Sequence, residues 1–468
     1  MNKPSTWTKT IVASMTSYID AGSIVAGAAG LALWKEYLQM GDWQLGLLGA
    51  CSSNALSAAI GALIGGRICD LYGRKLVYTY DLLFYIIGML LIVFGVNYQM
   101  LLIGYIIVGL SVGADVAASW TLIAENAPAE NRARHCGTAQ LMWALGPAVV
   151  LLLSAVLEWQ LHLGVFGNRL VFGHLVVIAF VTWLMRLRMP ESEEWITNKQ
   201  KEKELIASGV WQKTSYWDLF TNKTNLRGIL LLIGVYMIWN LAAGTGGFFL
   251  PYIYENAGSV KIEASQELNS NNETKIIKNE DVSKEASQEL NLNNKTKKGG
   301  LSKETSLALS ALVFITSCFA TFFIFMKLAD RFSRRLIYFV VASLYIVAWG
   351  LFMLPKEYLG IGLFVITSIL MGINNGSGQQ AFYQMWGAEI FPARYRAAAQ
   401  GFSFFSARFF LSIWSFFVPI IIGKNGEGLP IVAVILVIFA TISMLIGTIF
   451  CPNTSGKTLD QIEKERYG

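Results

Sequence analysis

The chain has 468 residues, of which 54% are hydrophobic and only 15% are charged, with 28 Phe, 14 Trp and 43 Gly. This composition is too apolar for a soluble domain of this length, so it excludes the soluble globular class and indicates a protein that crosses a membrane many times. The formal net charge of +6 reflects the loops between the apolar segments and gives no reason to expect nucleic acid as a partner.

Apolar segments long enough to cross a bilayer recur along the whole chain, six before and six after a polar stretch at 188–227. The first segment is too long for the core of a signal peptide, so we expect it to remain as a spanning helix. The expected spans are 10–34, 43–68, 76–96, 98–123, 135–157, 169–187, 228–253, 305–327, 336–354, 358–385, 397–422 and 428–450. The predicted fold class is therefore an all-α polytopic membrane protein with twelve transmembrane helices.

These spans divide the chain into an N-terminal six-helix bundle at 1–187, a linker at 188–227, a C-terminal six-helix bundle at 228–451 and a tail at 452–468. If both termini lie inside, the short outer loops hold only four basic residues, which are Lys35, Arg169, Lys356 and Lys424. Because Lys and Arg accumulate on the inner side of a membrane, this pattern predicts a multi-pass protein of the cell membrane with cytoplasmic termini and linker.

The outer segment 255–304 contains a tandem repeat. EASQELNSNNETK at 263–275 returns as EASQELNLNNKTK at 285–297, and both copies are rich in Asn, Glu, Lys and Ser. Such a composition cannot bury enough apolar surface to offset the entropy of ordering the chain. We expect a disordered or marginally helical loop.

Signs of enzymatic chemistry are missing from the sequence. It holds no Gly-x-x-x-x-Gly-Lys-Ser/Thr phosphate loop and no Gly-x-Ser-x-Gly elbow, and its three His and five Cys are scattered without metal spacing. We therefore expect no enzyme activity, no metal, no cofactor and no disulfide.

The two halves repeat each other at corresponding loops. GGRICDLYGRK at 65–75 is echoed by KLADRFSRR at 327–335, and AENAPAENRAR at 124–134 is echoed by AEIFPARYRA at 388–397. Internal repeats of this kind are typical of transporters in which two bundles, related by pseudo-twofold symmetry, rock about a site near the middle of the membrane.

The first of these loops, Gly-x-x-x-Asp-x-x-Gly-Arg-Lys, is similar to the signature of the major facilitator superfamily. Pro190-Glu191-Ser192 with Trp195, and the tail from Pro452 to Leu459, resemble motifs of its sugar-transporter-like branch. The resemblance covers essentially the whole chain. It implies a cytoplasmic latch that holds the outward-open state, with gating residues Asp70, Gly73, Arg74, Glu125, Arg132, Arg134, Asp330, Arg334, Arg335, Glu389 and Arg396.

Three of the charged residues in expected spans, Asp20, Asp115 and Arg408, lie far from the ends of their spans and are candidates for function. Arg408 is the only charge between Ala397 and Ile422, where a guanidinium costs about 3 kcal/mol and needs a compensating partner. Asp20 and Asp115 are carboxylates at membrane depth and are candidates for proton coupling. A fixed ion pair between Arg408 and one of these acids is the structural alternative. We expect Asp81 to pair with Arg67 or Lys75, and we do not include it in the candidate site.

The resemblance also bears on the substrate. The helix 7 amides by which hexose carriers bind hydroxyl groups correspond here to Ile238, Trp239 and Gly244, so that set is absent. Phosphate:proton symporters are similar at Asp20, Asp115 and Trp239 and carry a lysine at the position of Arg408, although Ala243 argues against inorganic phosphate. Organic-anion carriers resemble this chain in the arginine at position 408. This comparison implies a larger anionic or polyhydroxylated metabolite.

Polar and aromatic residues of other spans complete the candidate site. Amides in a spanning helix are costly toward lipid and useful toward a hydroxylated substrate, and helical spacing predicts that Asn375 and Gln379 share one face. The substrate-binding candidates are Arg408, Trp239, Asn240, Asn375, Gln379, Trp143 and Tyr18.

The prediction is a monomeric secondary transporter in the lipid bilayer, a proton symporter for a small anionic or polyhydroxylated metabolite. The alternatives are a facilitative or proton-coupled sugar or polyol carrier, a drug:proton antiporter, and a receptor-like sensor with a transporter fold.

Overall fold

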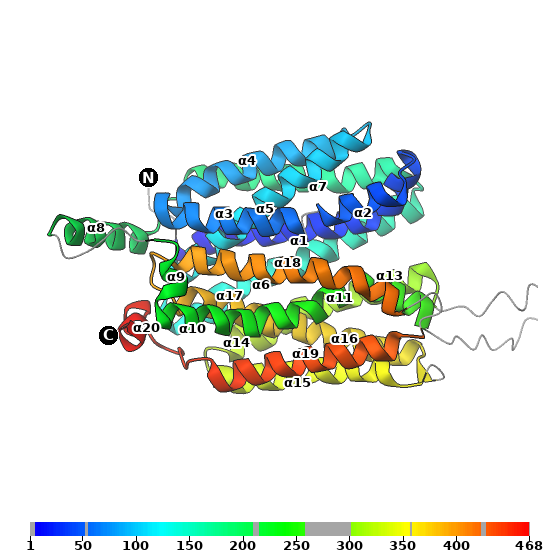
Figure 1. Ribbon diagram of the computed structural model, residues 1–468. Helices are drawn as coiled ribbons and strands as arrows, with labels where there is room; N and C mark the ends of the chain where they lie inside the picture. Colours follow the sequence, from blue (N-terminus) through cyan, green and yellow to red (C-terminus); the bar gives the residue numbers. More distant parts are fainter. Residues whose placement is uncertain are drawn as a thin grey trace, which may run out of the picture.

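The computed structural model describes residues 5–51, 55–208, 215–257, 301–355, 358–422 and 427–467, and every regular element in them is helical (Figure 1). The tandem repeat at 263–297 lies outside the described residues, so its predicted conformation stays a prediction.

The N-terminal half contains the helices from α1 to α7. Their bounds are α1 Thr6–Tyr37, α2 Asp42–Ala50, α3 Leu56–Tyr72, α4 Arg74–Val93, α5 Tyr98–Asn126, α6 Arg132–Ser154 and α7 Gly164–Leu187. A 3-10 turn at Ala129–Asn131 precedes α6, and a π-helical turn at Ala155–Gln160 follows it. The polar linker contains α8 Glu193–Ala207 and α9 Asp218–Thr221.

The C-terminal half repeats this arrangement with more interruptions. Its helices are α10 Lys223–Leu232, α11 Ile238–Ala257, α13 Lys303–Ala320, α14 Met326–Leu328, α15 Arg334–Gly350, α16 Ile361–Ser377, α17 Gln379–Glu389, α18 Arg396–Ile422 and α19 Leu429–Phe450. The tail forms α20 Leu459–Tyr467. Turns of π-helix at Ile233–Met237 and Thr321–Phe325 and a 3-10 turn at Leu351–Met353 join successive helices.

Eleven helices of the described part are long and apolar enough to span a membrane, where the sequence predicts twelve. The difference is the expected span 43–68, which the structure describes as the two helices α2 and α3. The expected span 358–385 also differs, because the chain turns at Gly378 between α16 and α17. Asn375 and Gln379 therefore belong to different helices, so the spacing of one continuous helix, from which we predicted that they share a face, does not apply to them.

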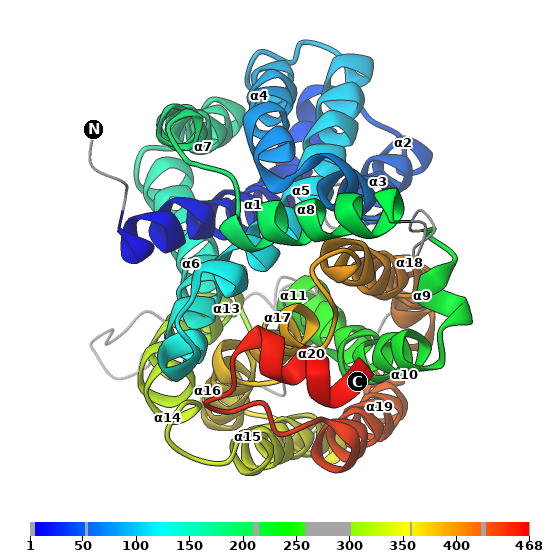
Figure 2. The same cartoon turned by 90° about the vertical axis from the view of Figure 1, so that its left-hand side faces the viewer.

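The two halves lie side by side, with α1 to α7 on one side and α10 to α19 on the other (Figure 2). Both termini, α8 and α20 lie at one end of the bundle, called here the terminal end (Figure 1). Large apolar side chains such as Phe180, Ile366 and Phe416 are exposed on the outside. In a bilayer such a surface faces lipid, and the polar residues are left to the interior.

Close contact between α3 and α18 joins the halves near the terminal end. A Cβ atom on Gly66 would lie 2.4 Å from the carbonyl oxygen of Ala397, and one on Gly401 would lie 2.2 Å from that of Ala62. Only glycine allows two helices to approach so closely, because any side chain would collide with the opposite backbone.

Candidate functional site

A buried charge cluster closes the terminal end on the side of α4 and α18. Asp70, in the last turn of α3, accepts hydrogen bonds from the backbone N–H groups of Ala397 (3.2 Å) and Ala398 (2.7 Å) at the start of α18. The free N–H groups and the dipole of a helix N-terminus favour such an anion. Asp70 thus binds the first half to the second.

Glu125 completes this cluster. Its carboxylate accepts from Arg74 at 2.6 Å and from Arg396 at 2.9 Å, and Arg396 also pairs with Glu194 of α8 at 2.8 Å. Arg74 and Arg396 are buried, and the side chain of Glu125 is 0% exposed. One carboxylate therefore links an arginine of the N-terminal half to an arginine of the C-terminal half.

The second half builds the same arrangement at the equivalent loops. Asp330 accepts from the N–H groups of Ala133 (3.1 Å) and Arg134 (3.2 Å) in the first turn of α6. Glu389 pairs with Arg334 at 2.9 Å and with Arg132 at 3.0 Å. The predicted gating residues are thus brought together, in two clusters related by the internal repeat.

Two acids of these clusters lie outside the spanning segments. Burial raises the pKa of Asp330 above its ordinary value, although the backbone N–H of Ala133 and the Arg334 guanidinium act in the opposite direction. Burial likewise raises the pKa of Glu194, against the attraction of Arg396. Both carboxylates depend on their partners to remain charged.

Gly73 has a structural role that its motif alone does not reveal. Its φ of +104° lies in the region that favours glycine, and a Cβ atom there would lie 2.2 Å from Glu191 Oε2. Glu191 accepts from the N–H groups of Arg74 and Lys75, both at 3.0 Å, and so caps α4. The sequence analysis selected neither Glu191 nor Glu194 as a gating residue. Glu191 lies in the Pro190-Glu191-Ser192 motif, and Glu194 lies two residues after it.

Arg335, which the resemblance placed in the latch, has a different contact. Its Nε donates to the carbonyl oxygen of Cys451 at 2.7 Å, within the C-terminal half. Arg134 contributes its backbone N–H to Asp330.

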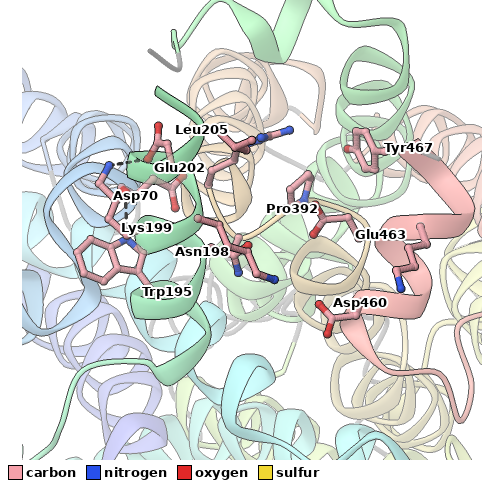
Figure 3. Close-up of a pocket in the computed structure, with 14 residues that line it drawn as sticks. Asp70, Trp195, Asn198, Lys199, Glu202, Leu205, Pro392, Asp460, Glu463 and Tyr467 are labelled. Carbon is pink, nitrogen blue, oxygen red and sulfur yellow. Dashed lines mark hydrogen bonds and ion pairs between the residues drawn. The ribbon is translucent and has the colours of Figure 1, made fainter. Parts of the chain in front are cut away.

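An open cavity of about 460 Å³ lies at the terminal surface between α8 and α20 (Figure 3). Trp195 of α8 donates from its indole N–H to the carbonyl oxygen of Asp70 at 3.0 Å, and Asp460 and Tyr467 come from α20. The cavity lies at the terminal surface beside Asp70 of the charge cluster. It is separate from the buried polar residues of the spanning helices.

Asp20 lies deep in α1. Its side chain is 1% exposed, and neither carboxylate oxygen has a hydrogen-bond partner among the described residues. The charges that act on it through space are those of Arg408 and Asp115. Arg408 is itself buried in α18, with its guanidinium carbon 4.8 Å from the centre of the Phe404 ring.

Asp115 does not form the ion pair with Arg408 that the sequence suggested as an alternative. Its partner is Arg186 in the last turn of α7, at 2.9 Å, and the same guanidinium reaches Asp81 at 3.4 Å. The assignment of Asp81 to Arg67 or Lys75 is therefore wrong. Arg186 lies at the end of an apolar span, where an arginine is usually an anchor at the membrane surface. For this reason the sequence analysis did not select it as a partner of these acids.

Arg186 also contacts hydroxyl groups and an aromatic ring. It donates to Thr16 of α1 and, at 3.3 Å, to Ser119 of α5, and its guanidinium carbon lies 4.5 Å from the centre of the Tyr78 ring. A guanidinium with two carboxylates and two hydroxyl groups around it is well compensated for its burial.

Aromatic rings bridge the two halves at the level of these residues. Trp120 of α5 contacts the rings of Tyr383 (5.9 Å between centres) and Phe404 (6.2 Å) in the other half, and Trp143 of its own half (6.5 Å). Tyr236 stacks on Tyr383 at 4.0 Å. Of these five, the sequence reading selected only Trp143, because a lone aromatic in a span is indistinguishable from packing.

Buried amides also meet between the halves. Gln140 of α6 donates to the carbonyl oxygen of Asn375 at 2.6 Å and accepts from Gln384 of α17 at 3.0 Å. Trp239 and Gln379, both predicted to bind substrate, are joined through Asn374: the indole N–H donates to its oxygen at 2.9 Å, and its NH₂ donates to Gln379 at 2.7 Å.

Several of these amides keep polar atoms unused. Buried side-chain atoms with no hydrogen-bond partner among the described residues include those of Asn240 (Oδ1), Asn375 (Oδ1), Gln379 (Nε2), Gln380 (Nε2) and Gln384 (Oε1). Tyr18, the remaining candidate, is bonded through its hydroxyl group to His174 Nε2 at 3.3 Å. Such a concentration of unused donors and acceptors is unusual in a protein interior.

Comparison with known proteins agrees with this geometry. Residues 27–224 and 296–465 match the family described as "Sugar (and other) transporter". Over 461 residues, which are 98% of this chain and 94% of the relative, the sequence is 48% identical to the minor myo-inositol transporter IolF of Bacillus subtilis (strain 168). It is 24% identical to the glucose transporter GlcP of Staphylococcus epidermidis, over 88% of this chain and 87% of that one.

Among solved structures, the proton:xylose symporter XylE from E. coli, bound to 6-bromo-6-deoxy-D-glucose, superposes with a TM-score of 0.72. The match covers 98% of both chains at 16% sequence identity, so it shows the fold alone. These matches confirm the predicted all-α transporter fold and family resemblance. The relatives are named as transporters, which confirms the prediction that the chain is not an enzyme.

Proposed function

The chain belongs to the sugar transporter family of the major facilitator superfamily, and on this basis we propose that it carries a neutral polyol of the myo-inositol class across the cell membrane by alternating access. The terminal end is the cytoplasmic end in this proposal. The charge clusters around Glu125 and Glu389 then form the closed cytoplasmic gate, and the substrate binds between the two halves above it.

The observation that carries this proposal is the set of buried amides with unused polar atoms in the C-terminal half, of which Asn375 and Gln384 contact Gln140 of the N-terminal half. Each hydroxyl group of a polyol is both a donor and an acceptor, so a ring bearing several of them can satisfy Asn240, Asn375 and Gln384 together. A substrate without these groups would leave the amides unpaired, at a cost of about 1–3 kcal/mol each. Trp143 and Tyr18 would flank the ring.

Asp20 is the proton carrier in this proposal. A carboxylate that is 1% exposed, with no hydrogen bond to either oxygen, is easily neutralised by a proton and is not fixed by a partner at contact distance. The structural neighbour XylE is described as a proton:xylose symporter, which supports proton coupling in this fold.

A sugar acid is the second candidate substrate, because Arg408 places a buried guanidinium in α18. A carboxylate would pair with it in a bidentate manner that a neutral polyol cannot use. The 48% identity to a myo-inositol transporter favours the neutral polyol.

A binding measurement separates the two candidates. We expect myo-inositol to raise the melting temperature of the purified protein and to bind by calorimetry, and glucuronate to do neither, since only a ligand of the folded state stabilises it. Arg408→Ala is the diagnostic variant. The sugar acid would be favoured if the wild type bound glucuronate and not myo-inositol, and if Arg408→Ala lost the binding of glucuronate. Binding of neither compound would contradict both assignments.

A further inference from the structure

Three buried carboxylates of the N-terminal half surround one small cavity. Asp20 of α1, Asp81 of α4 and Asp115 of α5 all line it, together with the hydroxyl-bearing residues Thr16 and Ser111. Its volume of about 10 Å³ is close to the space that one water molecule needs. The carboxylates are therefore separated by a polar gap of the size of one water.

The charges around this cavity do not balance. Asp81 and Asp115 share the single guanidinium of Arg186, at 3.4 and 2.9 Å, and the cation that acts on Asp20 is Arg408. Three carboxylate charges are thus set against the two guanidinium charges of Arg186, in contact, and Arg408, through space, and guanidinium groups stay protonated in proteins. Because an excess charge in a low-dielectric interior is expensive, the cluster is stable when it holds one proton.

We propose that Asp81 and Asp115, held by Arg186, form a second proton station, and that one proton moves between this station and Asp20 through a water molecule in the cavity. This inference rests on the proposed proton-coupled function and adds the route that the proton follows. Asp20–OH gives its proton to the water, the water gives a proton to the Asp81 carboxylate, and no other bond is made or broken. Arg186, in the last turn of α7, places the second station toward the terminal end.

The other titratable or charged groups near the cluster come from three neighbouring helices. Tyr85 and Tyr78 of α4 donate their hydroxyl groups to the carbonyl oxygens of Ile19 (3.1 Å) and Ala118 (3.5 Å). Cys69 of α3 is fully buried, and Arg408 of α18 has been counted above. The two phenols already use their protons in hydrogen bonds, which leaves the three carboxylates as the groups that exchange a proton.

The variant Asp81→Asn tests the charge count. It leaves Arg186 paired with Asp115, the shorter of its two contacts, and leaves two carboxylates facing two guanidinium groups. In proteoliposomes we expect the wild type to move one proton with each myo-inositol, and its affinity to change about tenfold per pH unit where the cluster titrates. In Asp81→Asn we expect no proton flux and no uphill accumulation, whereas exchange of myo-inositol across the membrane persists.

The variant Ser111→Val tests the route without changing the charge. Ser111 bonds to the carbonyl oxygen four residues earlier, Ile107, and the added methyl group would fill the cavity. We expect coupled uptake to slow at least about tenfold, with wild-type pH dependence of binding. Ser310→Val in α13 is the matched control, since Ser310 bonds in the same way to Ser306 and lies in the other half.

The outcomes are separable. Wild-type proton stoichiometry in Asp81→Asn would overturn the second station. Unslowed uptake in Ser111→Val would overturn the water route, and this test does not require that Asp81→Asn folds. A wild type that transports myo-inositol without any proton flux would refute the proton-coupled function itself, independently of both variants.

Discussion

Asp20 is the residue whose surroundings fit proton transfer most directly, because it is buried and makes no hydrogen bond through its carboxylate to any described residue. A group in that position can change its charge without breaking a contact. Every other acid at this depth in α4 and α5 shares Arg186.

We expect Asp20→Asn to abolish accumulation driven by a pH gradient while leaving exchange of bound substrate. The amide keeps the size of the side chain and cannot be charged, so only the coupling is removed. Uptake into proteoliposomes with and without an imposed gradient measures the difference. Uphill uptake at the wild-type level would remove Asp20 from the mechanism.

Arg186 has the opposite character, since its role in binding two acids is structural as well as electrostatic. We expect Arg186→Met to lower the free energy of unfolding by about 3–5 kcal/mol, because it leaves Asp81 and Asp115 buried without their cation. The triple variant with Asp81→Asn and Asp115→Asn should recover most of that loss. Thermal unfolding of the purified variants measures both; equal melting temperatures for the single and triple variants would contradict the pairing.

Among the helices, the contact between α3 and α18 determines whether the terminal end can stay closed. Gly66 and Gly401 permit an approach at which the side chain of any other residue meets opposite backbone. That contact also brings Asp70 to the first N–H groups of α18. The packing of small residues and the anchoring of the gate therefore depend on each other.

We expect Gly66→Ala to weaken closure of the terminal end, since its Cβ would lie 2.4 Å from the carbonyl oxygen of Ala397. Cys136, which is 4% exposed in α6 near this end, should then react faster with a maleimide. Gly173→Ala in α7 is the control, because a Cβ there has no atom within 4 Å. Mass spectrometry of the peptide containing Cys136 gives the rate, and an unchanged rate in Gly66→Ala would contradict the role of this contact.

For the whole molecule, the two gate clusters make closure a property of both halves at once. Asp70 caps a helix of the second half and Asp330 caps a helix of the first, while Glu125 and Glu389 each hold two arginines. A rocking motion of the halves must break both clusters together. Opening of the terminal end therefore involves both copies of the repeated loop.

We therefore expect Glu125→Gln and Glu389→Gln to shift the protein toward the state open at the terminal end by similar amounts. Each removes the negative charge that two buried arginines share, at a cost to the closed state of up to about 3–5 kcal/mol. Distances between spin labels on α8 and α20 report the shift. A large effect of one variant and none of the other would mean that a single cluster controls the gate.

Features that depend on short stretches of chain could be predicted from the sequence. Apolar length predicted the spanning helices except over 43–68, which the structure describes as two helices. The paired loops around Asp70 and Asp330 predicted both the two-bundle fold and the gate, because their spacing is local and occurs twice. The sequence also selected Asp20, Asp115 and Arg408, since a charge within an apolar run is visible without any neighbour.

Which of these charges meet depends on how the helices pack and could be learned from the structure alone. Asp115 pairs with Arg186, 71 positions away, and Asp81 shares that partner, although nothing in the spacing of the three connects them. The same holds for Gln140 and Gln384 and for Trp120 and Tyr383, which lie on different halves. Contacts between helices are set by how the helices rotate and cross, and the hydrophobic pattern of a membrane span, apolar on nearly all sides, leaves that rotation undetermined.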